Sequence, residues 1–264
     1  ITLWAFLRVR EEPANWRWPA LFWAGIAIGL LLKGLIAALF PVGAVAAYLL
    51  VTREWKLLWL LRPISGTALL LFIAAPWHIA AMLMNPPYFD FTMKSEPGQY
   101  HGFFWFYFLN EHVFRFLNMR HPRDYNTVPR ALFWLFHLLW LFPWSAFFPA
   151  TLQLSYQPTD RAGRTRLLAF CWAAFVMIFF TFSTTQEYYS MPIYPALALL
   201  LGSAMATVDK LWILRGRLLI AGIAGAAASA SAFEPNHANT LGPPPEMLEP
   251  SAPRSSAAAF TCAK

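Results

Sequence analysis

Charged residues are scarce in this chain. Only 12% of its 264 residues are charged and 58% are hydrophobic, with 24 Phe and 13 Trp. Water-soluble domains carry about a quarter charged residues, so this composition excludes an ordinary soluble fold and indicates a polytopic membrane protein. The formal net charge of +7 needs no nucleic-acid partner to explain it, because the basic residues gather in short loops, as the positive-inside rule predicts.

Cysteine is also rare, and this excludes two further classes. Cys171 lies in an apolar run and Cys262 lies near the C-terminus, and neither has ligand-like spacing to the other or to a His. We therefore expect no disulfide framework, no metal site and no cofactor. His101, His112 and His121 are separated by 11 and 9 residues, which matches no standard set of metal ligands.

The chain lacks an initiating Met and begins at Ile1 within an apolar stretch. We therefore expect that an N-terminal part is missing from this sequence. After about residue 231 the composition changes to Pro, Ala, Ser, Glu and Asn, which cannot bury enough apolar surface to order a chain. The sequence predicts a transmembrane domain over 1–231 and a disordered or extraneous tail over 232–264.

Long apolar segments predict an all-α polytopic bundle of about eight spans, one of them partial. The expected segments are 1–9 (partial), 16–32, 35–51, 66–84, 130–151, 166–183, 189–207 and 212–231. Four basic loops, within 8–17, 53–62, 152–166 and 208–217, lie two crossings apart, so one orientation makes all of them cytoplasmic. The Lys33 turn, a long loop over about 85–130 and a short turn near 184–187 then share the non-cytoplasmic face.

Lys33 is the most informative residue, because it lies at the midpoint of an otherwise uncharged run from Leu21 to Thr52. Basic flanks on both sides of this run predict a hairpin of two short helices, with Lys33-Gly34 as the turn. An ammonium at membrane depth is costly unless it faces a polar cavity or an anion. The alternative is an ordinary lysine whose charged end reaches the interface.

The segment over 102–117 is too apolar for a solvated loop and too charged at its C-terminal end for a span. An amphipathic helix lying at the membrane interface fits it best. Glu111 and Arg115 are four residues apart on this helix, so a local ion pair is the simplest interpretation of both.

Three short motifs resemble bacterial membrane glycosyltransferases of family 39, the group with the aminoarabinose transferases and the protein mannosyltransferases. Leu32-Lys33-Gly34 resembles the family's "TKG" element. The other two are the stretch running from Asn110 through Phe116 with the later Trp140–Trp144, and the stretch Phe182–Pro192 that opens a span. The order and spacing of the three motifs also fit the family, and the resemblance covers about residues 16–207.

The resemblance implies a GT-C-like multi-pass protein of the bacterial inner (cytoplasmic) membrane. It would move a sugar from a polyprenyl-phosphate lipid to a lipid, glycan or protein acceptor on the non-cytoplasmic face, among membrane lipids and without nucleic acid. Lys33 and Arg115 would bind the lipid phosphate, Lys as a point charge and Arg as a planar clamp. The residues expected to contact the substrates are Glu111, His112, Gln186, Glu187, Tyr188 and Tyr189.

The family's general base, an aspartate, would lie upstream of Ile1, and the chain contains no Asp-x-Asp or Asp-Glu pair. The fragment alone is therefore expected to be inactive. Glu187 also has a simpler interpretation, as an acid favoured at a helix N-terminus. Two alternatives to the enzyme stay open. One is a transporter or lipid-phosphate-binding membrane protein, although no internal repeat is visible, and the other is an inactive pseudogene product.

Overall fold

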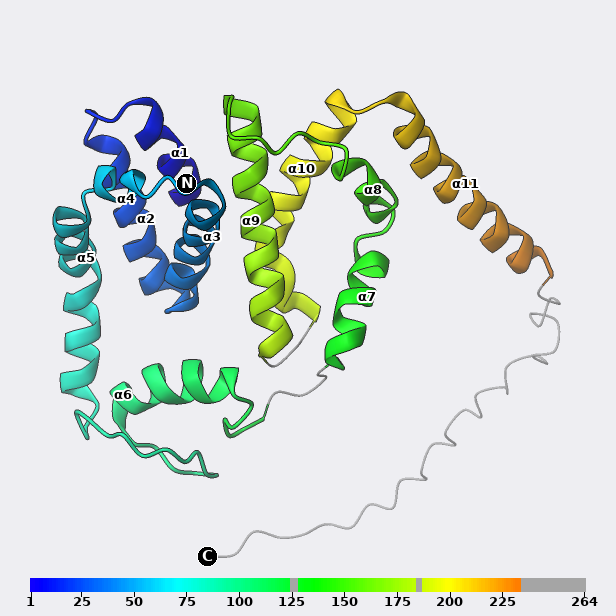
Figure 1. The fold of residues 1–264 in the computed structure, drawn as a ribbon. Helices are drawn as coiled ribbons and strands as arrows, with labels where there is room; N and C mark the ends of the chain where they lie inside the picture. Colours follow the sequence, from blue (N-terminus) through cyan, green and yellow to red (C-terminus); the bar gives the residue numbers. More distant parts are fainter. Residues whose placement is uncertain (124–127, 184–186, 234–264) are drawn as a thin grey trace, which may run out of the picture. The chain divides into compact units, whose positions relative to one another are not determined.

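The computed structural model describes residues 1–123, 128–183 and 187–233, and its described regular elements are all helical. The chain divides into two compact units, Ile1–Ile220 and Ala221–Lys264; the site lies within the first. The elements, labelled in Figure 1, are α1 (Thr2–Glu11), α2 (Arg17–Lys33), α3 (Ile36–Thr52), α4 (Lys56–Leu60), α5 (Pro63–Met84), α6 (Gly102–Phe104), η1 (Trp105–Phe114), α7 (Arg130–Trp140), η2 (Trp144–Phe147), α8 (Phe148–Thr151), α9 (Arg161–Phe182), η3 (Glu187–Ile193), α10 (Tyr194–Thr207) and α11 (Lys210–Phe233).

The predicted hairpin is confirmed. α2 ends at Lys33 and α3 begins at Ile36, and each helix has 17 residues. At 1.5 Å per residue each is about 25 Å long, close to the thickness of a bilayer core. Gly34 makes the turn with a φ of +90°, a backbone conformation that glycine adopts without a steric penalty.

A helix occupies each predicted span, but one span is not continuous. Within the span predicted over 130–151, Leu132–Trp140 and Trp144–Thr151 meet at a bend of 101°. Pro143 lies at this bend and cannot donate the backbone N–H that would continue the helix. Among the described residues, four helices are long and apolar enough to cross a membrane, or five if the bent pair is one span. α3 is apolar but shorter.

α9 lies at the centre of the packing. Its buried residues near the N-terminal end, including Leu168 and Cys171, pack with α1, α2 and α3. Farther along, Val176 and Phe180 pack with Phe133 of α7 and with residues of α10. α9 therefore joins the N-terminal and C-terminal helices of the first unit, which lie on either side of it in Figure 1.

The helix predicted over 102–117 is also present, as α6 and then η1, and η1 is wound as a π-helix. In Figure 1 it runs across the bundle instead of along it. The loop before it is fastened by side chains. Trp105 Nε1 donates to the Thr92 carbonyl at 2.7 Å, and Ser95 Oγ donates to the buried Asn110 at 2.7 Å. These bonds fasten the preceding loop to the helix that carries Glu111, His112 and Arg115.

Polar contacts join three of the four basic loops at one end of the first unit. Arg10 pairs with Glu54, and Arg161 and Arg164 approach Glu11 at 3.4 and 3.9 Å. Arg166 of α9 also donates from Nε to Ser203 Oγ of α10 at 2.6 Å, and α10 leads into the fourth loop. The arrangement agrees with the single orientation expected from the charge pattern.

Candidate functional site

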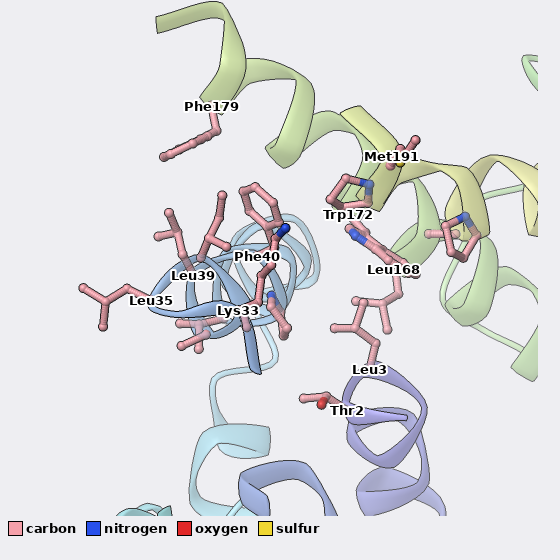
Figure 2. Close-up of a pocket in the computed structure, with 18 of the residues that line it drawn as sticks. Thr2, Leu3, Lys33, Leu35, Leu39, Phe40, Leu168, Trp172, Phe179 and Met191 are labelled. Atoms are coloured by element: carbon pink, nitrogen blue, oxygen red, sulfur yellow. The ribbon is translucent and has the colours of Figure 1, made fainter. Parts of the chain in front are cut away.

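One large pocket contains most of the predicted site residues. Its volume is about 1650 Å³, and its walls come from α1, α3, the loop helix, α9 and the start of α10. Figure 2 draws part of the lining, in which Lys33 appears with apolar side chains that include Leu3, Leu39, Phe40, Leu168 and Trp172. The predicted site residues in its lining are Lys33, Glu111, His112, Arg115, Tyr188 and Tyr189. The sequence therefore identified residues that the fold gathers around one space.

Lys33 is the last residue of α2 and is exposed to this pocket. Within the described part of the chain it forms no hydrogen bond and no ion pair. A cation without a counter-charge among the described residues, in the lining of a mainly apolar cavity, is suited to an anionic ligand. That an anion binds there stays a prediction.

Arg115 has several neighbours. Its Nη1 lies 3.1 Å from Glu111 Oε2, so the ion pair expected from helical spacing is confirmed. Its guanidinium carbon lies 5.8 Å from the centre of the Tyr189 ring, within the range of a cation–π contact. The Arg115 side chain is 36% exposed, which leaves part of the guanidinium open to the pocket.

Arg120 is a residue that the sequence analysis missed. Its Nη1 donates to both carboxylate oxygens of Glu111, at 2.9 and 2.8 Å, and its Nε donates to the Pro122 carbonyl at 3.1 Å. Glu111 is thus shared by two guanidinium groups. Arg120 lies nine residues after Glu111, beyond the i, i+4 spacing of a helix, so no local pattern pointed to this pair.

His112 is held by both ring nitrogens. Its Nε2 accepts a hydrogen bond of 3.0 Å from the Leu35 backbone N–H, and its Nδ1 donates to the Tyr107 carbonyl. The two bonds define the neutral tautomer with the proton on Nδ1. The predicted contact of His112 with substrate stays a prediction, and in this conformation its ring binds the Lys33 turn instead.

The remaining predicted site residues follow α9. Tyr188 is exposed and Tyr189 is half-buried, and their rings meet edge to face at 4.8 Å. Gln186 and the side chain of Glu187 lie outside the described residues, so their predicted roles stay predictions. Within the described ranges, no group of three or more His, Cys, Asp or Glu residues is arranged to hold a metal ion.

The charged residues around Lys33 and Arg115 favour an amphiphilic anion as the ligand of the pocket. Lys33 and Arg115 line it together with one carboxylate, Glu111, which Arg120 also binds. A second group of charged lining residues comes from α1 and α9, and the remaining lining is mainly aliphatic and aromatic; the four charged residues are Arg8, Glu11, Arg161 and Arg164. Cations in the lining of a mainly apolar cavity can hold a phosphate head group while the cavity accepts a hydrocarbon chain.

Comparison with known proteins identifies relatives with this architecture, although no family model matches the chain. A relative from Aeromonas salmonicida, named undecaprenyl phosphate-alpha-4-amino-4-deoxy-L-arabinose arabinosyl transferase, is 30% identical over 80% of this chain and 36% of its own length. One of the same name from Pseudomonas aeruginosa is 29% identical over 88% of this chain and 40% of its own length.

Solved structures agree. The crystal structure of ArnT from Cupriavidus metallidurans bound to undecaprenyl phosphate matches with a TM-score of 0.67 and 25% identity, over 89% of this chain and 41% of that one. The apo structure of the same protein matches with a TM-score of 0.62 and 22% identity, and it supports the fold alone.

The fold and the pocket thus define a multi-pass membrane protein of the GT-C architecture. The chain is a homologue of the bacterial aminoarabinose transferases, which confirms the family resemblance drawn from its motifs. It spans 36 to 40% of the length of the two relatives described above.

Proposed function

We propose that this chain forms part of a glycosyltransferase that takes a sugar from a polyprenyl-phosphate donor and places it on an acceptor at the non-cytoplasmic face. The observation that carries the proposal is the pocket, whose mainly apolar lining contains both Lys33 and Arg115. The names of the relatives support undecaprenyl phosphate as the lipid and 4-amino-4-deoxy-L-arabinose as the sugar. The acceptor would be a lipid, a glycan or a protein.

In the proposed reaction the bond between the anomeric carbon of the sugar and a phosphate oxygen breaks while the acceptor nucleophile bonds to that carbon. The electron pair of the broken bond goes to the departing lipid phosphate, whose negative charge grows. Fixed cations in a poorly hydrated cavity stabilise such charge in the transition state. Lys33 and Arg115 are the groups we assign to this task. The proton of an acceptor hydroxyl would go to a general base, a role that we assign to no residue of this chain.

The surrounding residues have supporting roles in this proposal. Glu111, held by Arg120, orients the Arg115 guanidinium toward the pocket. Tyr188 and Tyr189, with Gln186 and Glu187 beside them in sequence, are proposed to contact the sugar or the acceptor. The chain from residue 1 to 231 is the proposed membrane domain. We propose a tail over 232–264. Only its first two residues belong to the described part of the chain.

The test compares Arg115→Lys with wild type in membranes that contain the full-length enzyme at equal expression. Lysine keeps the charge but loses the planar fork. The loss of one charged hydrogen bond is worth roughly 1.5–3 kcal/mol, so we expect transfer of labelled sugar to fall about tenfold to a hundredfold. Glu111→Gln is expected to cost less, because Arg115 keeps its charge and its fork.

Arg123→Lys is the matched control, since Arg123 is exposed on the same loop and does not line the pocket. Transfer by Arg115→Lys within about twofold of wild type would remove the clamp role, because an exposed ion pair is worth under about 1 kcal/mol. If the wild type bound undecaprenyl phosphate without transferring sugar, the alternative of a lipid-phosphate-binding protein or a transporter would be favoured.

A further inference from the structure

We propose that His112 is a positioning residue that holds the Lys33 turn in a fixed place relative to Arg115. The inference rests on the proposed function, in which these two cations bind one lipid phosphate. It goes further because a third side chain sets the separation of the two cations. That side chain acts through the backbone of the hairpin turn.

The contact joins two segments that are far apart in sequence. Leu35 and His112 are separated by 77 residues, yet the Leu35 N–H donates to His112 Nε2 at 3.0 Å. Leu35 directly precedes α3, and its N–H belongs to the first turn, where helix N–H groups have no partner within the helix. His112 therefore caps α3 from another element and thereby fixes the turn.

The turn is shaped to receive this ring. Gly34 has a φ of +90°, and a Cβ built on it would lie 2.8 Å from His112 Nε2 and 3.3 Å from the Tyr107 hydroxyl oxygen. Tyr107 also approaches the turn from the loop helix, where its hydroxyl donates to the Leu30 carbonyl at 3.4 Å. Any side chain at position 34 would displace the imidazole, so the position of the His112 ring requires a glycine at position 34.

The other ring nitrogen fixes the imidazole to its own helix. His112 Nδ1 donates to the Tyr107 carbonyl, five residues earlier. With Nδ1 carrying the proton, Nε2 is the acceptor that the Leu35 N–H requires. The ring thus bridges the hairpin turn and the loop helix, and it cannot rotate without breaking both bonds.

Both cations depend on this bridge for their placement. Lys33 lies two residues before Leu35 and has no hydrogen bond or ion pair of its own with the described residues. Arg115 lies three residues after His112 on the loop helix. A phosphate gripped from two elements gains affinity when their separation is fixed before binding, because less ordering is needed.

The first experiment measures the separation directly. Spin labels are placed at Leu32→Cys and Met119→Cys, both exposed positions outside the pocket lining. The full-length protein carries Ala in place of its native cysteines, Cys171 and Cys262 among them, and pulsed dipolar spectroscopy records the distance distribution. We expect a narrow distribution in the otherwise wild-type protein, a broad one for His112→Ala, and a narrow one for His112→Gln, whose side-chain oxygen can accept from Leu35. A narrow distribution for His112→Ala would overturn the proposal.

The second experiment measures binding of undecaprenyl phosphate to the same purified proteins. His112→Ala should weaken binding about threefold to tenfold, as expected for one net hydrogen bond, and His112→Gln should restore most of the loss. Gly34→Ala, which displaces the ring from the opposite side, should behave like His112→Ala and serves as the second variant if that one fails to fold. Unchanged binding by His112→Ala and Gly34→Ala would also overturn the proposal.

His121→Ala is the matched control, because the His121 ring is exposed on the same loop and lines no part of the pocket. Lys33→Ala separates the two hypotheses. If Lys33→Ala binds undecaprenyl phosphate as well as wild type, the proposed phosphate site fails, whatever the distance distribution shows. If Lys33→Ala loses binding but His112→Ala keeps both the narrow distribution and the affinity, only the positioning role fails.

Discussion

At the scale of single residues, the two proposed phosphate contacts differ in how they are held. Arg115 pairs with Glu111, which Arg120 also binds, and it lies near the Tyr189 ring. Lys33 has no such partner among the residues that the structure describes. An arginine fixed by neighbours suits an oriented, two-pronged contact, whereas a lysine with a free end suits a point charge that follows the phosphate.

Asp90 gives a prediction about pH at this scale. The Thr92 hydroxyl and N–H donate to Asp90 Oδ1 at 2.6 and 2.7 Å, and His101 Nδ1 lies 2.9 Å from Oδ2. The Thr92 hydroxyl, then the Thr92 backbone N–H, hold the pKa of Asp90 below its ordinary value of 3.8. A lowered pKa stabilises the folded loop above that ordinary value, and the stabilisation is lost as the pH falls through the lower, folded-state pKa.

The expected result is a pH-dependent difference between wild type and Asp90→Asn. At neutral pH the amides of residues 88–101 should exchange faster in the variant, because the charged acceptor for Thr92 is gone. The difference should shrink only at a pH below 3.8, as the pH falls through the lowered pKa of the wild-type Asp90 carboxyl and this carboxyl also becomes neutral. Hydrogen-exchange mass spectrometry checks this, with Glu96→Gln as the exposed-carboxylate control. Equal exchange by Asp90→Asn and wild type at pH 7 would contradict it.

At the scale of elements, hydropathy and charge were enough to predict the helices. The hairpin at Lys33-Gly34 and the helix beginning at Gly102 were both found where expected, because apolar length and a glycine turn are local properties of the sequence. The 101° bend after Trp140 was not predicted. Proline is tolerated in membrane helices as a kink or as a break, and the choice depends on what the two halves pack against.

The contact between α2 and α5 gives a prediction at this scale. A Cβ built on Gly66 would lie 1.9 Å from Trp23 Nε1, and this indole N–H donates to the Leu61 carbonyl at 2.8 Å. Gly66→Ala should displace the indole and lower the free energy of unfolding by about 1–3 kcal/mol, as overpacking does. Thermal unfolding of the purified protein in detergent measures this.

Gly202→Ala is the control for that substitution, because a Cβ on Gly202 meets nothing within 4 Å. In the interior of α10 it should raise helix stability by about 0.5–1 kcal/mol, the usual difference between Ala and Gly. A melting temperature for Gly66→Ala at or above that of Gly202→Ala would show that the indole moves aside without cost.

At the scale of the whole molecule, the sequence predicted which residues would share a site but not how they are connected. The hairpin turn and the loop helix were placed on one face by counting basic loops, and the bond between Leu35 and His112 joins them. No periodicity encodes a hydrogen bond across 77 residues or a carboxylate shared by Arg115 and Arg120. Such contacts follow from tertiary packing, which local patterns do not specify.

The last prediction concerns the orientation of the molecule in the membrane. The four basic loops lie at one end of the first unit, and short loops rich in Lys and Arg stay in the cytoplasm. The hairpin turn and the long loop should therefore both face the opposite side. We expect Leu32→Cys and Lys94→Cys to react with an impermeant maleimide from outside spheroplasts, and Lys56→Cys to react only in inverted vesicles. All three positions are exposed in the structure, and every native cysteine of the full-length protein, Cys171 and Cys262 among them, would be replaced by Ala so that each variant has one thiol. Labelling of Leu32→Cys from the cytoplasmic side alone, with Lys94→Cys labelled from outside, would place the turn and the loop on different faces, and the site that joins Lys33 to Arg115 could then not form.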